Sequence, residues 1–191
     1  MKIPFRVVVA LLASSLSSLS NGAFADTVVP WNFIDAASVK RGEGNNVTIT
    51  GIGLRSKNLK TWNLEKLGVL GLSIEGRIDD WHGHEADARI TQVYDLCITP
   101  VLRLEHPLSN GVTPYVEMGL GAHLLSHVHI NHERTFSTAY QFGEFVGTGV
   151  RFGERKEYEV GVILQHDSNA SIKRPNNGLT YGALLLNYHF R

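Results

Sequence analysis

Apolar and polar side chains alternate along most of the chain, and the alternation is clearest near the C-terminal end. One face of the last apolar segment carries Leu184, Leu186, Tyr188 and Phe190, and the other carries Ala183, Leu185, Asn187 and His189. Residues 115–124 and 159–165 show the same period of two. This period places successive side chains on opposite faces of a β-strand, so the sequence predicts strands with one apolar face.

Eight such segments follow one another, with polar or glycine-bearing turns between them. Helical periodicity is weak along the chain, and residues 59–67 are the best local candidate for a helix. Glycines are frequent inside the predicted strands, where they would relieve crowding in a tightly curved barrel. The pattern is typical of an eight-stranded antiparallel transmembrane β-barrel, although a soluble lipocalin-like barrel also alternates. The predicted strands cover roughly residues 28–41, 46–56, 67–80, 88–105, 112–127, 137–153, 157–169 and 179–190.

The N-terminus has the pattern of a secretory signal peptide. Lys2 and Arg6 supply a positive start, an apolar run follows at 7–13, and Ala23-Phe24-Ala25 fits a small-x-small cleavage site. The sequence thus predicts a signal peptide at 1–25 and a single barrel domain at 26–191. Export together with the alternating pattern favours the outer membrane over the soluble alternative.

Charge and cysteine content exclude several classes of protein. The whole chain has 18 basic and 18 acidic residues, and loss of Lys2 and Arg6 leaves about −2, which does not indicate nucleic-acid binding. Cys97 is the only cysteine, so there is no internal disulfide. The sequence has no P-loop, no dinucleotide fingerprint and no H-E-x-x-H motif, and we expect no cofactor.

If both termini lie in the periplasm, the connections near 81–87, 126–136 and 169–179 are extracellular. They are the longer polar connections, and they carry five of the histidines. The spacing of the last three resembles a metal site, but no cysteine lies beside them. We therefore interpret them as polar loop residues and assign no metal to His82, His84, His127, His129 and His132.

The stretch QHDSNASIKRPNNG at 165–178 places a histidine and a serine two residues apart. His166 and Ser168 continue the even-numbered apolar face of 160–164, which in a barrel is the lipid face. Polar side chains without a partner are costly there. Their Cα atoms would lie about 6.6 Å apart, close enough for the Oγ–imidazole pair of a serine hydrolase.

The pattern H-x-S-N-A-x-I-K-x-P-N-x-G from His166 to Gly178 resembles the signature of the lipid A 3-O-deacylase family, the PagL-type outer-membrane enzymes. Segments 142–144, 149–152 and 188–190 are similar to that family as well. The resemblance implies an eight-stranded barrel whose lipid-facing site hydrolyses the 3-position ester of lipid A in lipopolysaccharide. It also points to a homodimer, which no residue pattern indicates.

Carried over to this sequence, the resemblance implies Ser168 as nucleophile and His166 as general base. It implies Asn169 and Asn176 as residues that position the substrate or stabilise the oxyanion. The family has a glutamate two residues after the glycine of the motif, and Thr180 stands at that position here. A threonine accepts a hydrogen bond but cannot stabilise an imidazolium by its charge.

We expect Glu144 to replace the missing acid. If the 153–157 hairpin is centred on Arg155, Glu144 lies directly opposite His166 and shares its lipid-facing parity. A slip of one residue would turn Glu144 to the other face.

The sequence therefore predicts an outer-membrane esterase that removes the 3-O-linked acyl chain of lipid A by a Ser-His mechanism. Two alternatives stay open. Thr180 favours a non-catalytic barrel with a role in adhesion or envelope integrity. An esterase that acts on another lipid would share every feature described above.

Overall fold

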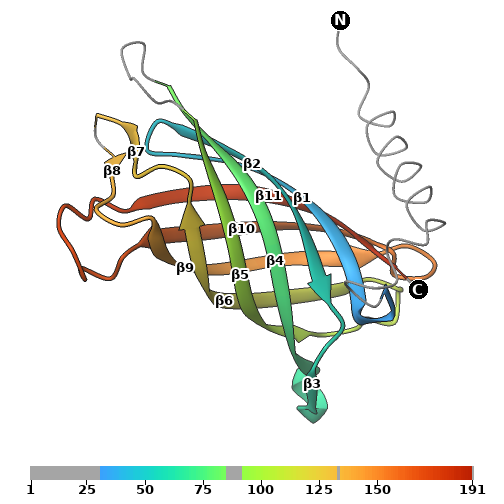
Figure 1. Cartoon of the computed structure of the whole chain (residues 1–191). Helices are drawn as coiled ribbons and strands as arrows, with labels where there is room; N and C mark the ends of the chain where they lie inside the picture. The colour runs from blue at the N-terminus through green and yellow to red at the C-terminus, as the bar shows by residue number, and fades with distance from the viewer. Residues whose placement is uncertain (1–30, 85–91, 133, 191) are drawn as a thin grey trace, which may run out of the picture. The chain divides into compact units, whose positions relative to one another are not determined.

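The computed structural model describes residues 31–84, 92–132 and 134–190. Eight long antiparallel strands close into a barrel, in which each strand pairs with the next along the chain and the last pairs with the first (Figure 1). The closure follows from the β1–β11 and β2–β4 pairings. The barrel strands are β1 (Ile34–Gly44), β2 (Val47–Ser56), β4 (Val69–Gly83), β5 (Gln92–Glu105), β6 (Thr113–Leu125), β9 (Tyr140–Phe152), β10 (Tyr158–Ser168) and β11 (Leu179–His189).

The predicted eight-stranded barrel is confirmed, with boundaries that shift by a few residues. The predicted strand 28–41 lies instead at Ile34–Gly44, and the predicted strand 88–105 begins at Gln92. The helical candidate at 59–67 is wrong in most of its length. It forms a short strand, β3 (Lys60–Asn63), which pairs with β4, and a single 3-10 turn, η2 (Glu65–Leu67).

Three further short elements complete the described chain. A 3-10 turn, η1 (Trp31–Phe33), precedes β1, and the connection from β6 to β9 forms a small hairpin of β7 (His129–Asn131) and β8 (Arg134–Thr135). The predicted signal peptide at 1–25 lies outside the described residues. No helix in the described ranges is long and apolar enough to cross a bilayer.

The outer wall of the barrel is apolar over most of its height. Side chains on this face are about half exposed although they are large and hydrophobic, including Ile52, Ile78, Leu96, Ile98, Val116, Met118, Leu120, Val146, Val162 and Leu164. Aromatic side chains gather toward both ends of β9, with Tyr140 beside Phe142 at one end and Phe152 beside Tyr158 at the other. An apolar band between aromatic girdles is the surface of a transmembrane barrel.

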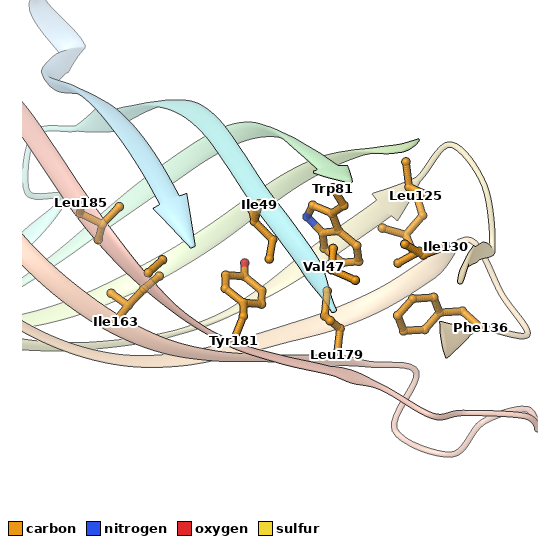
Figure 2. Packing of buried hydrophobic residues seen from close by; sticks show 12 residues of the cluster. Val47, Ile49, Trp81, Leu125, Ile130, Phe136, Ile163, Leu179, Tyr181 and Leu185 are labelled. Carbon is orange, nitrogen blue, oxygen red and sulfur yellow. The ribbon is translucent and has the colours of Figure 1, made fainter. Parts of the chain in front are cut away.

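The interior is filled rather than open. At the end that carries the β7–β8 hairpin, an apolar plug packs Trp81 against Phe136 with ring centroids 6.2 Å apart (Figure 2). Toward the other end, buried acidic and basic side chains form a network in which Arg55 and Arg103 share Glu117. Burial of paired charges away from lipid explains why the inward-facing positions are polar in the sequence.

Candidate active site

Three neighbouring strands place the predicted site residues on the outer wall of the barrel. His166 of β10 is paired with Glu144 of β9 on one side and with Thr180 of β11 on the other. The predicted register of the β9–β10 hairpin is therefore confirmed. All three side chains share one face because the side-chain period of a strand is two.

His166 is oriented by Thr180, not by Glu144. Its Nδ1 lies 2.8 Å from Thr180 Oγ1, a hydrogen-bond distance. No hydrogen bond or ion pair joins His166 to Glu144 within the described residues, although the two are cross-strand partners. The residue at the position of the family acid therefore contacts the histidine, but as a neutral hydroxyl.

Thr180 is held from both sides of its own strand. Its backbone N–H donates to Asn45 Oδ1 at 2.9 Å, in the tight turn that joins β1 to β2. Asn45 and Asn46 both have positive φ values, 49° and 59°, as a two-residue hairpin turn requires. The turn thus fixes the backbone that presents the Thr180 hydroxyl to His166.

Ser168 ends β10 on the same outer face, opposite Phe142. Its Oγ accepts a long hydrogen bond, 3.5 Å, from the backbone N–H of Ala170. No hydrogen bond joins Ser168 Oγ to the His166 ring among the described residues. The predicted Oγ–imidazole pair is therefore not formed in this structure, and catalytic hydrogen bonds are often long or misaligned without substrate.

The two predicted asparagines order the loop between β10 and β11. Asn176 Oδ1 accepts the backbone N–H of Asn169 at 3.0 Å. The buried Asn169 side chain donates through Nδ2 to Ser137 Oγ and to Lys173 O, each at 2.9 Å. These contacts are positioning contacts, because the amide hydrogens of Asn169 already have acceptors in the protein.

A second loop, between β6 and β9, supports this one, and no pattern in the sequence predicted the contact. Ser137 Oγ donates to Lys173 O at 2.8 Å, and Phe136 forms an isolated β-bridge with Asn176. Phe136 is 1% exposed because its ring lies in the interior plug against Trp81. The loop after Ser168 is therefore clamped to the β6–β9 connection, more than 30 residues away in sequence.

Gly178 provides the space into which the histidine ring fits. A Cβ at this position would lie 2.8 Å from His166 Cε1 and 3.2 Å from its Nε2. The φ value of Gly178 is +62°, in the left-handed region that glycine adopts without strain. The motif has a glycine at position 178 because a larger side chain would collide with the His166 ring.

A groove of about 580 Å³ runs along the outer wall from the histidine. Glu144, His166 and Thr180 line one end, and the rest of its lining is mostly apolar. The groove crosses the strands through the cross-strand row Leu164, Val146, Met118, Leu102 and Leu72. Four strand spacings of about 4.8 Å give a length of about 19 Å.

The described parts of the predicted connections at 126–136 and 169–179 share one end of the barrel (Figure 1). Most of the predicted connection at 81–87 lies at the end of β4 or outside the described residues. Ser168 lies at the end of the barrel that carries the two described connections, and its cross-strand neighbour Phe142 stacks edge-on against Tyr140 with centroids 5.0 Å apart. Aromatic pairs of this kind lie at the level of the lipid headgroups. The site is therefore at the boundary between the apolar wall and the polar loops.

The fold and the outer wall define an outer-membrane β-barrel, with serine and histidine side chains on its membrane-facing surface. The model of the family "Lipid A 3-O-deacylase (PagL)" matches residues 49–189, well over half of the chain. The chain belongs to this family.

Curated relatives and a solved structure agree with this assignment. The lipid A deacylase PagL of Bordetella bronchiseptica is 37% identical over 76 residues, 40% of this chain and 41% of that protein. The lipid A deacylase PagL of Pseudomonas aeruginosa is 27% identical over 120 residues, 63% of this chain and 65% of that protein. The matches thus span less than two thirds of these relatives. The crystal structure of the outer membrane enzyme PagL superposes with a TM-score of 0.69 at 22% sequence identity. The match covers 80% of this chain and 98% of that one, so the two share the fold.

Proposed function

We propose that this protein is an esterase that hydrolyses the 3-O-linked acyl chain of lipid A in lipopolysaccharide by a Ser-His mechanism. One observation carries the proposal: the His166–Thr180 hydrogen bond of 2.8 Å holds the imidazole at the end of an apolar groove on the lipid-facing wall, two residues before Ser168 on the same face of β10. Family membership and the names of the relatives supply the substrate class.

In this proposal, Thr180 Oγ1 accepts the Nδ1–H of His166, which leaves Nε2 free to act as the base. His166 takes the Ser168 hydroxyl proton as Oγ attacks the ester carbonyl carbon. The tetrahedral intermediate collapses, the sugar oxygen leaves with the proton, and water then hydrolyses the acyl-enzyme. The Ala170 N–H, 3.5 Å from Ser168 Oγ, is the nearest backbone donor for the oxyanion.

The groove supports an acyl-chain substrate that stays in the membrane. Its length of about 19 Å is similar to one leaflet of hydrocarbon, about 15 Å. Its polar end carries the histidine, and its far end at Leu72 lies toward β3, away from the loops. A substrate that diffuses laterally would place its ester at His166 while its chain remains in an apolar environment.

The test is mass spectrometry of lipid A from cells that express the wild type or Ser168→Ala. We expect loss of one 3-hydroxyacyl chain with the wild type and none with Ser168→Ala, at equal amounts of folded barrel. Unchanged lipid A with the wild type would reject the proposal. It would favour the non-catalytic barrel or a different lipid substrate, the two alternatives that the Thr180 substitution leaves open.

Two further roles are proposals that mutagenesis can test: Glu144 as substitute acid, and Asn169 and Asn176 as residues that position the substrate or stabilise the oxyanion. The homodimer stays a prediction. The proposed reaction uses side chains and water, without a cofactor.

A further inference from the structure

Inside the barrel, behind the wall that carries the candidate active site, three metal-ligating side chains converge and a further carboxylate lies beside one of them. Asp95 and Cys97 are two residues apart on β5, and His123 of β6 is the cross-strand partner of Cys97. One ligand atom from each lies within 4.8 Å of the others, and all three residues are buried. Asp167 of β10 joins them, with its Oδ1 3.6 Å from His123 Nδ1.

A glycine on the intervening strand β9 lets side chains of β6 and β10 approach each other. Gly143 of β9 pairs with Asp167. A Cβ on Gly143 would collide with His123 Nε2 and with Asp167 Oδ1. Any other residue would therefore separate the imidazole from the carboxylate, so the backbone at this level is built to bring the two side chains together.

The negative charge of this cluster is not balanced by the described residues. Asp95 and Asp167 have side chains with no exposed surface, and neither forms an ion pair with a lysine or arginine in the described ranges. Both contact His123, whose Nδ1 lies 2.7 Å from Asp95 Oδ2, and Asp167 Oδ1 also accepts a hydrogen bond from the neutral Gln165 Nε2 at 2.9 Å. One oxygen of each carboxylate, Asp95 Oδ1 and Asp167 Oδ2, is buried without a hydrogen-bond partner.

Other buried carboxylates of the interior, in contrast, have a lysine or arginine partner. Glu75, Glu117 and Glu159 each contact an arginine, and Asp79 contacts Lys40. Burial of a carboxylate without such a partner is strongly unfavourable, so a cation or a proton has to neutralise this cluster.

We propose that Asp95, Cys97, His123 and Asp167 bind a divalent transition metal, for which zinc is the best fit. One thiolate, one imidazole and carboxylate oxygens form a donor set that suits zinc, and four protein ligands make a closed structural site. Cys97 and His123 also line a cavity of about 10 Å³. The two unpartnered carboxylate oxygens supply the charge that a divalent ion requires.

The metal would stabilise the strand that carries the active site. Asp167 lies between His166 and Ser168 on β10 and points to the opposite face. A metal that holds Asp167 from inside would fix the backbone from which the other two project. The site itself does not depend on the proposed esterase activity, because metal binding is measured directly.

The experiment uses the full-length protein refolded in detergent with Co²⁺ or Zn²⁺ and then freed of unbound metal. Cys97 is the only cysteine of the chain, so a cobalt–thiolate charge-transfer band can come from this site alone. We expect this band and one zinc per chain by elemental analysis. Cys97→Ser should lose the band and His123→Gln should lose most of the metal. Thr99→Ser, on the same strand and lining the same cavity, should keep both.

Two results would overturn the proposal. One is a folded wild-type barrel, verified by its heat-dependent gel mobility, that retains no metal. The other is equal metal retention by wild type and His123→Gln, which would assign the ion to a site elsewhere, such as the loop histidines. In either case a proton, rather than a metal, neutralises the two carboxylates.

Discussion

The hydroxyl of Thr180 contacts His166 Nδ1 without carrying charge, and in the proposed mechanism this contact orients the base. Thr180→Val removes this hydrogen bond at nearly constant volume. A neutral hydrogen bond contributes about 1 kcal/mol, so we expect kcat to fall by roughly three- to tenfold. The measurement is the initial rate of acyl release from lipid A in detergent micelles. A rate equal to wild type would show that the bond does not orient His166.

Thr180→Glu should have the opposite effect. Position 180 is the direct cross-strand partner of His166, so a carboxylate there would reach the ring and stabilise the imidazolium. We expect kcat to rise by about tenfold or more in the same assay. Glu144→Gln, measured beside Thr180→Glu, tests whether the natural carboxylate of Glu144 acts as the acid. If Glu144→Gln abolishes activity and Thr180→Glu has no effect, the acid is Glu144.

Gly178→Ala should impair catalysis without unfolding the barrel. The added methyl lies 2.8 Å from His166 Cε1 and has to move the ring, and alanine at φ +62° adds strain of about 1 kcal/mol. We expect kcat to fall at least tenfold while heat-dependent gel mobility stays near wild type. Gly182→Ala is the matched control, because a Cβ at Gly182 meets its nearest atom only at 3.9 Å. Equal rates in both variants would contradict the steric role.

The sequence was sufficient to predict which residues flank His166 on the neighbouring strands, because parity and hairpin register are set by a period of two and a short turn. It correctly placed Glu144 and Thr180 beside His166. It could not show which of the two bonds to the ring, since that depends on side-chain geometry. We expected the carboxylate, and the structure has the hydroxyl.

At the scale of elements, the loop after β10 depends on the connection between β6 and β9. Ser137→Ala removes the hydroxyl that accepts from Asn169 Nδ2 and donates to Lys173 O. Two lost hydrogen bonds loosen the loop that begins at Ser168, so we expect kcat to fall several-fold with KM little changed. Ser137→Thr should restore much of the rate. Thr61→Ala, an exposed change in β3, is the control. A shift in KM alone would contradict a role in positioning the nucleophile.

The strands were predictable and the contacts between loops were not. Alternation identifies a strand locally, and an even number of strands with an apolar outer face indicates a membrane barrel. The bond from Ser137 to Asn169 joins two irregular segments with no periodic pattern. The β7–β8 hairpin likewise escaped prediction, because its two strands have three and two residues.

At the scale of the whole molecule, the interior is a cross-linked set of charges that join strands across the barrel. Arg103 of β5 contacts Glu117 of β6 at 2.8 Å and Glu159 of β10 at 2.6 Å. Its guanidinium also lies 3.9 Å from the ring centroid of Tyr115. Glu159 in turn contacts His189 of β11 at 2.8 Å. A closed ring of strands has no free edge, and these contacts add rigidity across its diameter.

Arg103→Met should therefore destabilise the barrel severely. The change keeps much of the side-chain volume but leaves Glu117 and Glu159 without their shared cation in a buried environment, which costs about 3–5 kcal/mol. Urea unfolding in detergent, followed by tryptophan fluorescence, should show a lower midpoint. Lys66→Ala, an exposed change in η2, should unfold like the wild type. Adding Glu159→Gln to Arg103→Met removes one uncompensated charge and should recover part of the loss. If Arg103→Met unfolds like Lys66→Ala, the interior network does not stabilise the barrel, and its stability comes from backbone pairing and the apolar wall.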